Sequence, residues 1–205
     1  MKRLIALALC LLLLAGCGGT VAETVTPTPE PTPRTVPLPV QTVVTAIGSD
    51  TCTAAVEGQS GTEAVTMTEV LGTFAHLGGP DFRLYADLAR YQINDTGTCC
   101  YMTLHTGMSG DVYGELGFRF GARSEELAET LPNEYGNILL CGDFGMEQLG
   151  DHSVRHVRGE TVQNIFDVYL LDTPEGCITM VISSTAQTEH HRNRLLASFE
   201  RLKIS

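Results

Sequence analysis

Basic residues are scarce in this chain, and tryptophan is absent. The 205 residues include 13 Lys and Arg against 24 Asp and Glu, which gives a formal net charge of −11. Proteins bind nucleic acid and anionic lipid surfaces through clustered basic residues. The composition therefore argues against a nucleic-acid partner and against direct adhesion to anionic lipid.

Complete catalytic motifs are also missing. Gly114, Gly117 and Gly121 do not have the spacing of a dinucleotide-binding loop. Asp143-Phe144-Gly145 spells the metal-binding tripeptide of kinases, but no catalytic loop or glycine-rich loop accompanies it. The cysteines form no C-x-x-C pair. The sequence therefore predicts a non-catalytic protein without a cofactor.

The first residues resemble an export signal. Lys2 and Arg3 precede an apolar run over 4–15, which is shorter than the ~20 residues of a membrane-spanning helix and matches a secretory signal peptide. Leu14-Ala15-Gly16-Cys17 resembles the lipobox of bacterial lipoproteins. The resemblance implies removal of residues 1–16, attachment of diacylglycerol to the Cys17 thiol, and a location on the outer face of the bacterial cell membrane. The alternative is an ordinary cleaved signal peptide, with Cys17 adjacent by chance.

A proline-rich segment follows the predicted anchor, and residues 17–40 are interpreted as the lipidated cysteine and a linker. Six of the nine prolines lie here, interleaved with threonines. Such a segment favours polyproline II, and at ~3.1 Å per residue it could hold a domain up to roughly 70 Å from the bilayer. Loss of Lys2 and Arg3 with the signal peptide changes the net charge from −11 to −13.

Residues 41–205 are long enough for a single domain with its own core. Five cysteines remain in this part of the chain. Disulfides can persist outside the cytoplasm, but five thiols cannot all pair. Buried free thiols are the alternative, and both possibilities stay open at this point.

Alternation of apolar and polar residues predicts a β-rich domain. Strands are expected at 42–47, 52–56, 64–70, 82–85, 91–93, 100–104, 115–120, 145–149, 153–158, 165–171 and 177–183. Helices are expected at 124–131, where Ser124 precedes two glutamates, and at 188–202, where Leu195, Phe199 and Leu202 share a face.

The order of these elements resembles the PsbP-like α/β/α sandwich over residues 80–205. The resemblance is best in Gly150-Asp151-His152-Ser153-Val154, Asp167-Val168-Tyr169, 177–183 and Ser198-Phe199. It implies an α+β fold in which helices pack on an antiparallel sheet, with residues 41–79 as a β-rich extension. It also implies binding or assembly work in the cell envelope, without specifying functional residues.

His152 and His156 are the candidate metal ligands, because alternate residues of a strand share one face. A zinc site would need a further ligand, for which Cys141, His190 or Glu160 is available. The alternative is the polar face of a half-exposed strand.

The adjacent Cys99 and Cys100 raise the possibility of redox chemistry. Neighbouring strand residues point to opposite faces, so one thiol is expected in the core and the other outside it.

Three functions are compatible with the sequence. The favoured one is a lipid-anchored, extracytoplasmic, non-catalytic binding or assembly module, whose partner is an envelope protein or a small extracellular ligand. The second is an extracytoplasmic enzyme that depends on a metal or a thiol. The third is a purely structural role.

Overall fold

The structure is a computed structural model that describes residues 41–105 and 112–205. The predicted signal peptide, Cys17 and the linker up to residue 40 lie outside the described residues. No helix in the described part of the chain has the length and apolarity needed to cross a membrane.

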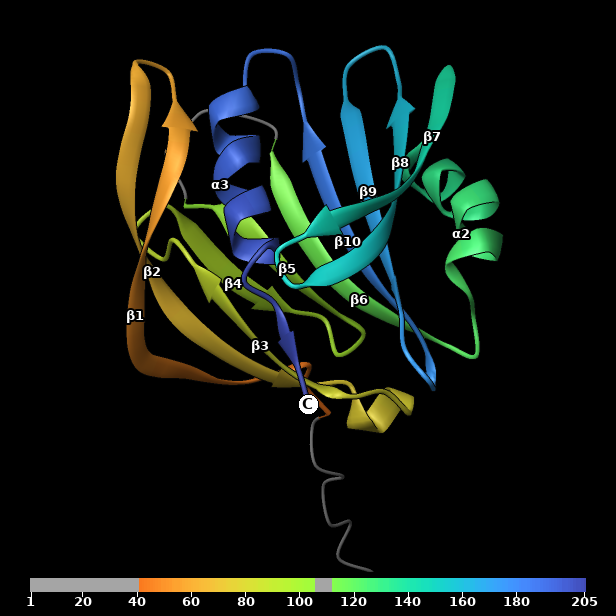
Figure 1. Ribbon diagram of the computed structural model, residues 1–205, viewed down its shortest axis with the longest axis horizontal. Helices are drawn as coiled ribbons and strands as arrows, with labels where there is room; N and C mark the ends of the chain where they lie inside the picture. The colour runs from red at the N-terminus through yellow and green to blue at the C-terminus, as the bar shows by residue number, and fades with distance from the viewer. Residues whose placement is uncertain (1–40, 106–111) are drawn as a thin grey trace, which may run out of the picture. The chain divides into compact units, whose positions relative to one another are not determined.

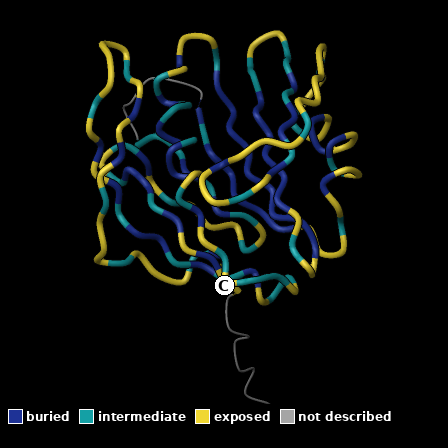
Figure 2. Tube along the Cα trace, viewed as in Figure 1, coloured by how far each residue is buried: buried dark blue, intermediate teal, exposed yellow. Residues whose placement is uncertain are grey.

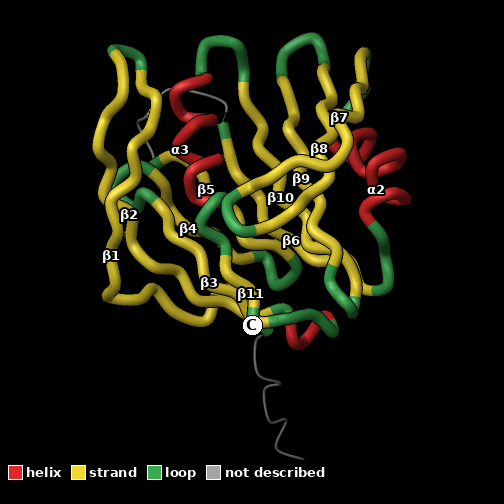
Figure 3. Tube along the Cα trace, viewed as in Figure 1, coloured by secondary structure: helices red, strands yellow, loops and turns green. Residues whose placement is uncertain are grey.

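Two antiparallel sheets make up most of the domain (Figures 1 and 3). The four-stranded sheet has the order β1-β2-β3-β11. Its members are β1 (Val44–Gly58), β2 (Gly61–Thr73), β3 (Asp81–Ala86) and β11 (Lys203–Ile204), with the 3-10 helix η1 (Ala75–Leu77) after β2.

The seven-stranded sheet has the order β4-β5-β6-β10-β9-β8-β7. Its members are β4 (Tyr91–Asp95), β5 (Cys99–Leu104), β6 (Tyr113–Phe120), β7 (Leu140–Leu149), β8 (His152–Glu160), β9 (Ile165–Asp172) and β10 (Gly176–Ser184). The helical segments are α2 (Ser124–Thr130), the 3-10 helix η2 (Leu131–Tyr135) and α3 (Glu189–Phe199).

Helix α3 lies between the β1–β2 hairpin and the seven-stranded sheet (Figure 1). Its Ala197 packs in an apolar cluster with the hairpin residues Val65 and Met67. Leu195 and Phe199 belong instead to the main core. The helix is therefore covered on two sides.

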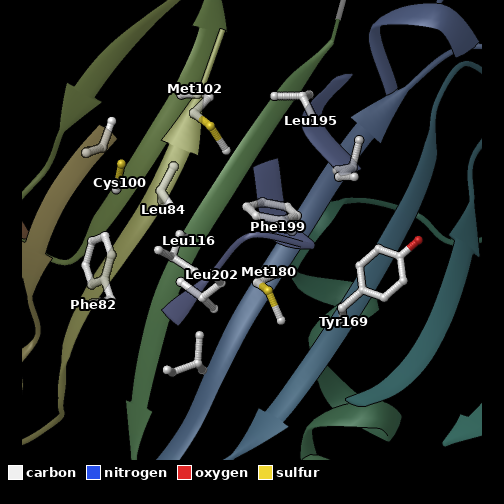
Figure 4. Packing of buried hydrophobic residues seen from close by; sticks show 14 of the residues in the cluster. Phe82, Leu84, Cys100, Met102, Leu116, Tyr169, Met180, Leu195, Phe199 and Leu202 are labelled. Carbon is white, nitrogen blue, oxygen red and sulfur yellow. The ribbon is translucent and has the colours of Figure 1, made fainter. Parts of the chain in front are cut away.

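The main core fills the space between the two sheets. Phe82 and Leu84 of the four-stranded sheet, Leu116 and Met180 of the seven-stranded sheet, and Phe199 of α3 all contribute to it (Figure 4). All five side chains are almost completely buried, and burial of each such apolar side chain favours folding by about 1.5–3 kcal/mol.

The opposite face of the seven-stranded sheet is covered unevenly. Ala128 of α2 and Leu131 of η2 pack on apolar residues of β8, β9 and β10, such as Val157, Val168 and Val181. The part of this face formed by β5 and β6 carries polar residues instead, and it forms the wall of a cavity described below.

The predicted PsbP-like α/β/α sandwich is wrong. Strands account for 57% of the described residues and helices for 16%. The two α-helices described, of 7 and 11 residues, are too short to form helical layers on both faces of a seven-stranded sheet. A second sheet occupies the place of one helical layer, and the predicted α+β class is replaced by a predominantly antiparallel β fold.

Two tight turns between neighbouring strands contain glycines at positive φ. Gly58 and Gly61 face each other across the tight turn between β1 and β2, and Gly61 has a φ of 116°. Gly97, with a φ of 78°, lies in the turn between β4 and β5, where its N–H donates to Oδ1 of Asp95 at 2.7 Å. Both glycines adopt positive φ angles that other residues rarely tolerate.

Candidate functional site

The two candidate metal-binding histidines have different partners. Nε2 of His152 lies 2.9 Å from the carbonyl oxygen of Leu202, and Nε2 of His156 lies 2.9 Å from Oδ1 of Asp167. Four residues along β8 separate the two histidines by roughly 13 Å. They share a face of the strand, as predicted, but they do not converge.

The proposed additional ligands do not complete a metal site. Cys141 pairs with Gly159 in the β7–β8 register, three residues beyond His156, which is roughly 10 Å along the strand. Glu160 lies one residue further, and His190 lies at the start of α3. Within 41–105 and 112–205, no group of three or more His, Cys, Asp or Glu side chains could hold a metal ion.

Asp167 lies at the centre of the network that contains His156. Its fully buried carboxylate accepts hydrogen bonds from Arg158 Nε at 2.9 Å and from Arg192 Nε at 2.6 Å, in addition to the contact with His156. Burial by itself raises the pKa of Asp167, but the hydrogen bonds from His156, Arg192 and Arg158 hold it well below its usual range. The carboxylate stays ionised and joins β8, β9 and α3, which is a structural role.

The adjacent thiols lie on opposite faces of β5, as the alternation of strand residues predicts. Cys100 is fully buried in the main core, whereas Cys99 borders the cavity on the other face. Burial raises the pKa of Cys99 to about 11 and the pKa of Cys100 to about 12. Catalytic cysteines require a lowered pKa, so both groups are protonated and poorly nucleophilic at neutral pH.

A cavity of about 440 Å³ lies on the β5–β6 part of the seven-stranded sheet, next to η2. Its lining includes aromatic rings, a buried carboxylate, a thiol and an arginine–glutamate pair. The residues that line it are Leu77, Thr98, Cys99, Tyr101, Glu115, Phe118, Arg119, Glu134 and Tyr135.

Glu115 is the buried carboxylate of this cavity and is only 5% exposed. Its Oε1 accepts hydrogen bonds from Tyr135 Oη at 3.1 Å and from Cys99 Sγ at 3.5 Å. The neighbouring Arg119 is paired with Glu134 at 2.6 Å. Across the described ranges, no Lys, Arg or His side chain forms an ion pair with Glu115, although buried carboxylates usually have a cationic partner.

Three tyrosines surround this carboxylate. Burial raises the pKa of Tyr101, Tyr113 and Tyr135, and the negative charge of Glu115 raises each of them further. The three phenols therefore stay neutral and can donate hydrogen bonds. The rings of Tyr101 and Tyr113 lie 6.1 Å apart between centroids.

Gly117 keeps the space beside Glu115 open. A Cβ atom at this position would lie 2.9 Å from Thr179 Oγ1 and 3.1 Å from Cys99 Sγ. Any larger residue would therefore crowd the cavity floor from the middle of β6.

Sequence reasoning missed Glu115 as a site residue. The available signal is its position between Gly114 and Leu116, within a run of five consecutive buried residues of β6. A charged residue in such a strand needs either a charged partner or a cavity. Glu115 is therefore a stronger indication of a functional site than the spacing of the two histidines on β8.

Comparisons with known proteins leave the chain unassigned to a family: no protein-family model matches it, and no match was found among curated proteins.

Proposed function

We propose that this chain is a lipid-anchored, extracytoplasmic, non-catalytic binding module of the bacterial cell envelope, and that its ligand is a small organic cation. The export signal and Cys17 support the location. The buried Glu115 carboxylate, which lacks a cationic partner in the described residues, supports the ligand class.

An ammonium or guanidinium group would supply the missing positive charge. Cations are also attracted to the faces of aromatic rings, and pockets for quaternary ammonium groups are typically built from such rings. Tyr101 and Tyr135 border the cavity beside Glu115. A volume of about 440 Å³ lies within the usual range of roughly 300–1,000 Å³ for small-molecule sites.

The chemistry of the cavity favours binding over catalysis. The Cys99 thiol is protonated, and no histidine borders the cavity to activate it. Tyr101 and Tyr135 have raised pKa values, so they do not act as bases at neutral pH. The site therefore offers the Glu115 carboxylate, which has no cationic partner in the described residues, beside neutral donors and the Arg119–Glu134 ion pair.

A calorimetric titration with choline tests the proposal on the full chain in a non-ionic detergent. The neutral analogue 3,3-dimethyl-1-butanol has nearly the same shape without the charge and serves as the ligand control. We expect choline to bind at least tenfold more tightly than the alcohol. Equal affinity for the two compounds would refute a charge-selective site.

Glu115→Gln is the informative variant because it removes the charge and nearly preserves the shape. The trimethylammonium group of choline has no N–H to donate, so Glu115 attracts it through charge. Two unit charges about 5 Å apart interact by about 3 kcal/mol at an effective dielectric constant of about 20, part of which is offset by desolvation, so we expect a roughly 10- to 100-fold loss of choline affinity. Glu125→Gln is the matched control, since the Glu125 side chain is 85% exposed on α2 and outside the cavity. Unfolding curves of both variants would separate loss of binding from loss of the fold.

A further inference from the structure

Exposed apolar side chains are concentrated at one edge of the seven-stranded sheet. Seven large hydrophobic side chains are exposed in the part of the chain that the structure describes, and four of them lie within residues 139–146. These are Leu139, Leu140, Phe144 and Met146, each at least 60% exposed. Figure 2 shows the corresponding strand, β7, as exposed over most of its length.

Strand β7 is the last strand of its sheet. Among the described strands it pairs with β8 alone, so the backbone N–H and C=O groups of its outer side have no strand partner. Natural proteins protect such edges with lysine, proline, inward-pointing charges or β-bulges, and the bulge of β7 lies between Asp143 and Gly145, beyond residues 139–142. Residues 139–149 contain neither lysine nor proline.

Charge makes this edge compatible with a second copy of the same acidic chain. Residues 139–142 carry no charge. Two carboxylates follow in β7. Asp143 accepts hydrogen bonds from Arg155 Nε at 3.0 Å and from Arg155 Nη2 at 2.7 Å, which neutralise it, and Oε2 of Glu147 lies 3.3 Å from Nδ1 of His156. Two copies with a net charge of about −13 each repel over most of their surface, but not along this segment.

The other long edge provides a comparison. Strand β1 is also an edge strand, but its exposed residues are mostly threonine, serine, alanine and acidic residues. Ile47 is the one large apolar side chain that is exposed on it. The apolar character is thus specific to β7.

Cys141 lies in the uncharged segment of β7. It is the one cysteine of residues 41–205 that is classed as exposed, and all five are free thiols. Cβ atoms directly opposite each other on antiparallel strands are about 4.5–5.5 Å apart, close to the 3.5–4.5 Å of a disulfide. A twofold axis near Cys141 would therefore bring the two thiols within cross-linking reach.

We propose that β7 pairs in antiparallel fashion with β7 of a second copy, about a twofold axis near Cys141. The pairing sets residues 139–143 of one copy against residues 143–139 of the other, joins the two seven-stranded sheets at this point and covers Leu139 and Leu140. The inference is independent of the Glu115 cavity, which lies on the β5–β6 part of the sheet.

Oxidative cross-linking of the full chain in isolated envelopes tests the pairing. Diamide would take up two electrons and two protons from two Cys141 thiols, and the products are the disulfide and the reduced hydrazine. We expect a dimer band on a non-reducing gel, with the linked peptide identified by mass spectrometry. Cys141→Ser should abolish this band but leave the sedimentation coefficient of the detergent-solubilised protein that of a dimer.

Leu140→Lys places a positive charge on the proposed interface and leaves the hydrophobic core unchanged, because the Leu140 side chain is exposed. We expect at least a tenfold weaker dimer by sedimentation and loss of the diamide cross-link, with choline binding unchanged. Ile47→Lys, on the edge of β1, is the matched control and should leave the dimer intact. The proposal is overturned if the wild type sediments as a monomer, if Leu140→Lys remains dimeric, or if Cys141 cross-links to a different protein.

Discussion

Replacement of Arg194 by methionine tests how α3 is attached to the rest of the fold. The Arg194 side chain is 4% exposed, and its Nη1 donates to Oδ2 of Asp87, also 4% exposed, at 2.8 Å. A second guanidinium nitrogen pairs with Glu63 of β2. One side chain of α3 therefore holds both the β1–β2 hairpin and the turn after β3.

Methionine fills a similar volume but leaves the Asp87 carboxylate buried without its cationic partner. Removal of one partner from a buried ion pair destabilises a protein by about 3–5 kcal/mol. Each kcal/mol lowers the melting temperature of a domain of this size by about 2–4 °C, so we expect a decrease on the order of 10 °C. Thermal and urea unfolding followed by circular dichroism would measure both quantities.

Two further variants complete the test. Lys203→Met removes an exposed ion pair with Asp151, which should change the stability by less than about 1 kcal/mol. The double variant Arg194→Met/Asp87→Leu removes both buried charges and should regain most of the lost stability, since Arg194 Nε is itself buried without a hydrogen-bond partner. If the free energy of unfolding of Arg194→Met lies within 1 kcal/mol of the wild-type value, the Arg194–Asp87 pair does not hold α3 to the rest of the domain.

Three shorter predictions concern pH, reactivity and backbone conformation. Burial, followed by nearby positive charge, lowers the pKa of His191 to about 4. Between about pH 4 and 6.5 the unfolded chain binds a proton that the folded chain does not. The free energy of unfolding should therefore fall as the pH decreases from about 6.5 towards 4, by up to about 1.4 kcal/mol per pH unit. In the His191→Gln variant, the midpoint of urea unfolding should depend less on pH over this range. Alkylation mapped by mass spectrometry should modify Cys141 rapidly and Cys177 only on unfolding, because burial raises the pKa of Cys177 to about 12; equal rates would contradict the burial described. Gly150→Ala should destabilise the domain by several kcal/mol, because φ at this position is 56° and a Cβ atom would lie 1.8 Å from the carbonyl oxygen of Glu200. Urea titrations would measure the change. A change below 1 kcal/mol would show that the backbone at Gly150 adapts to the side chain.

Local elements were predictable from the sequence because their signals are local. Alternation of apolar residues identified β8, β9 and β10, and the observed bounds of these strands lie within two residues of the expected ones. The pairing of strands was not predictable in the same way. Lys203 of β11 pairs with Arg83 of β3, and no pattern near either residue indicates the other.

The candidate site was predicted poorly for a related reason. The apolar pattern of the terminal helix gives no sign that His191 and Arg194 are buried, yet both are buried because α3 has a neighbour on two sides. The strand pattern places Glu115 on the face opposite Leu116, but it does not tell whether that face meets solvent, a helix or a cavity. What covers the Glu115 side of the strand depends on η2, a separate segment of the sequence.

The main core joins residues from the two ends of the domain. Val43, just before β1, and Leu202, just before β11, belong to the same apolar cluster, and the N–H of Ser205 donates to the carbonyl oxygen of Asp81. A chain that is synthesised residue by residue therefore cannot close this core until Leu202 is available. Folding of the domain is consequently delayed until its last strand is available, and the acidic segment before it must stay soluble and unfolded until then.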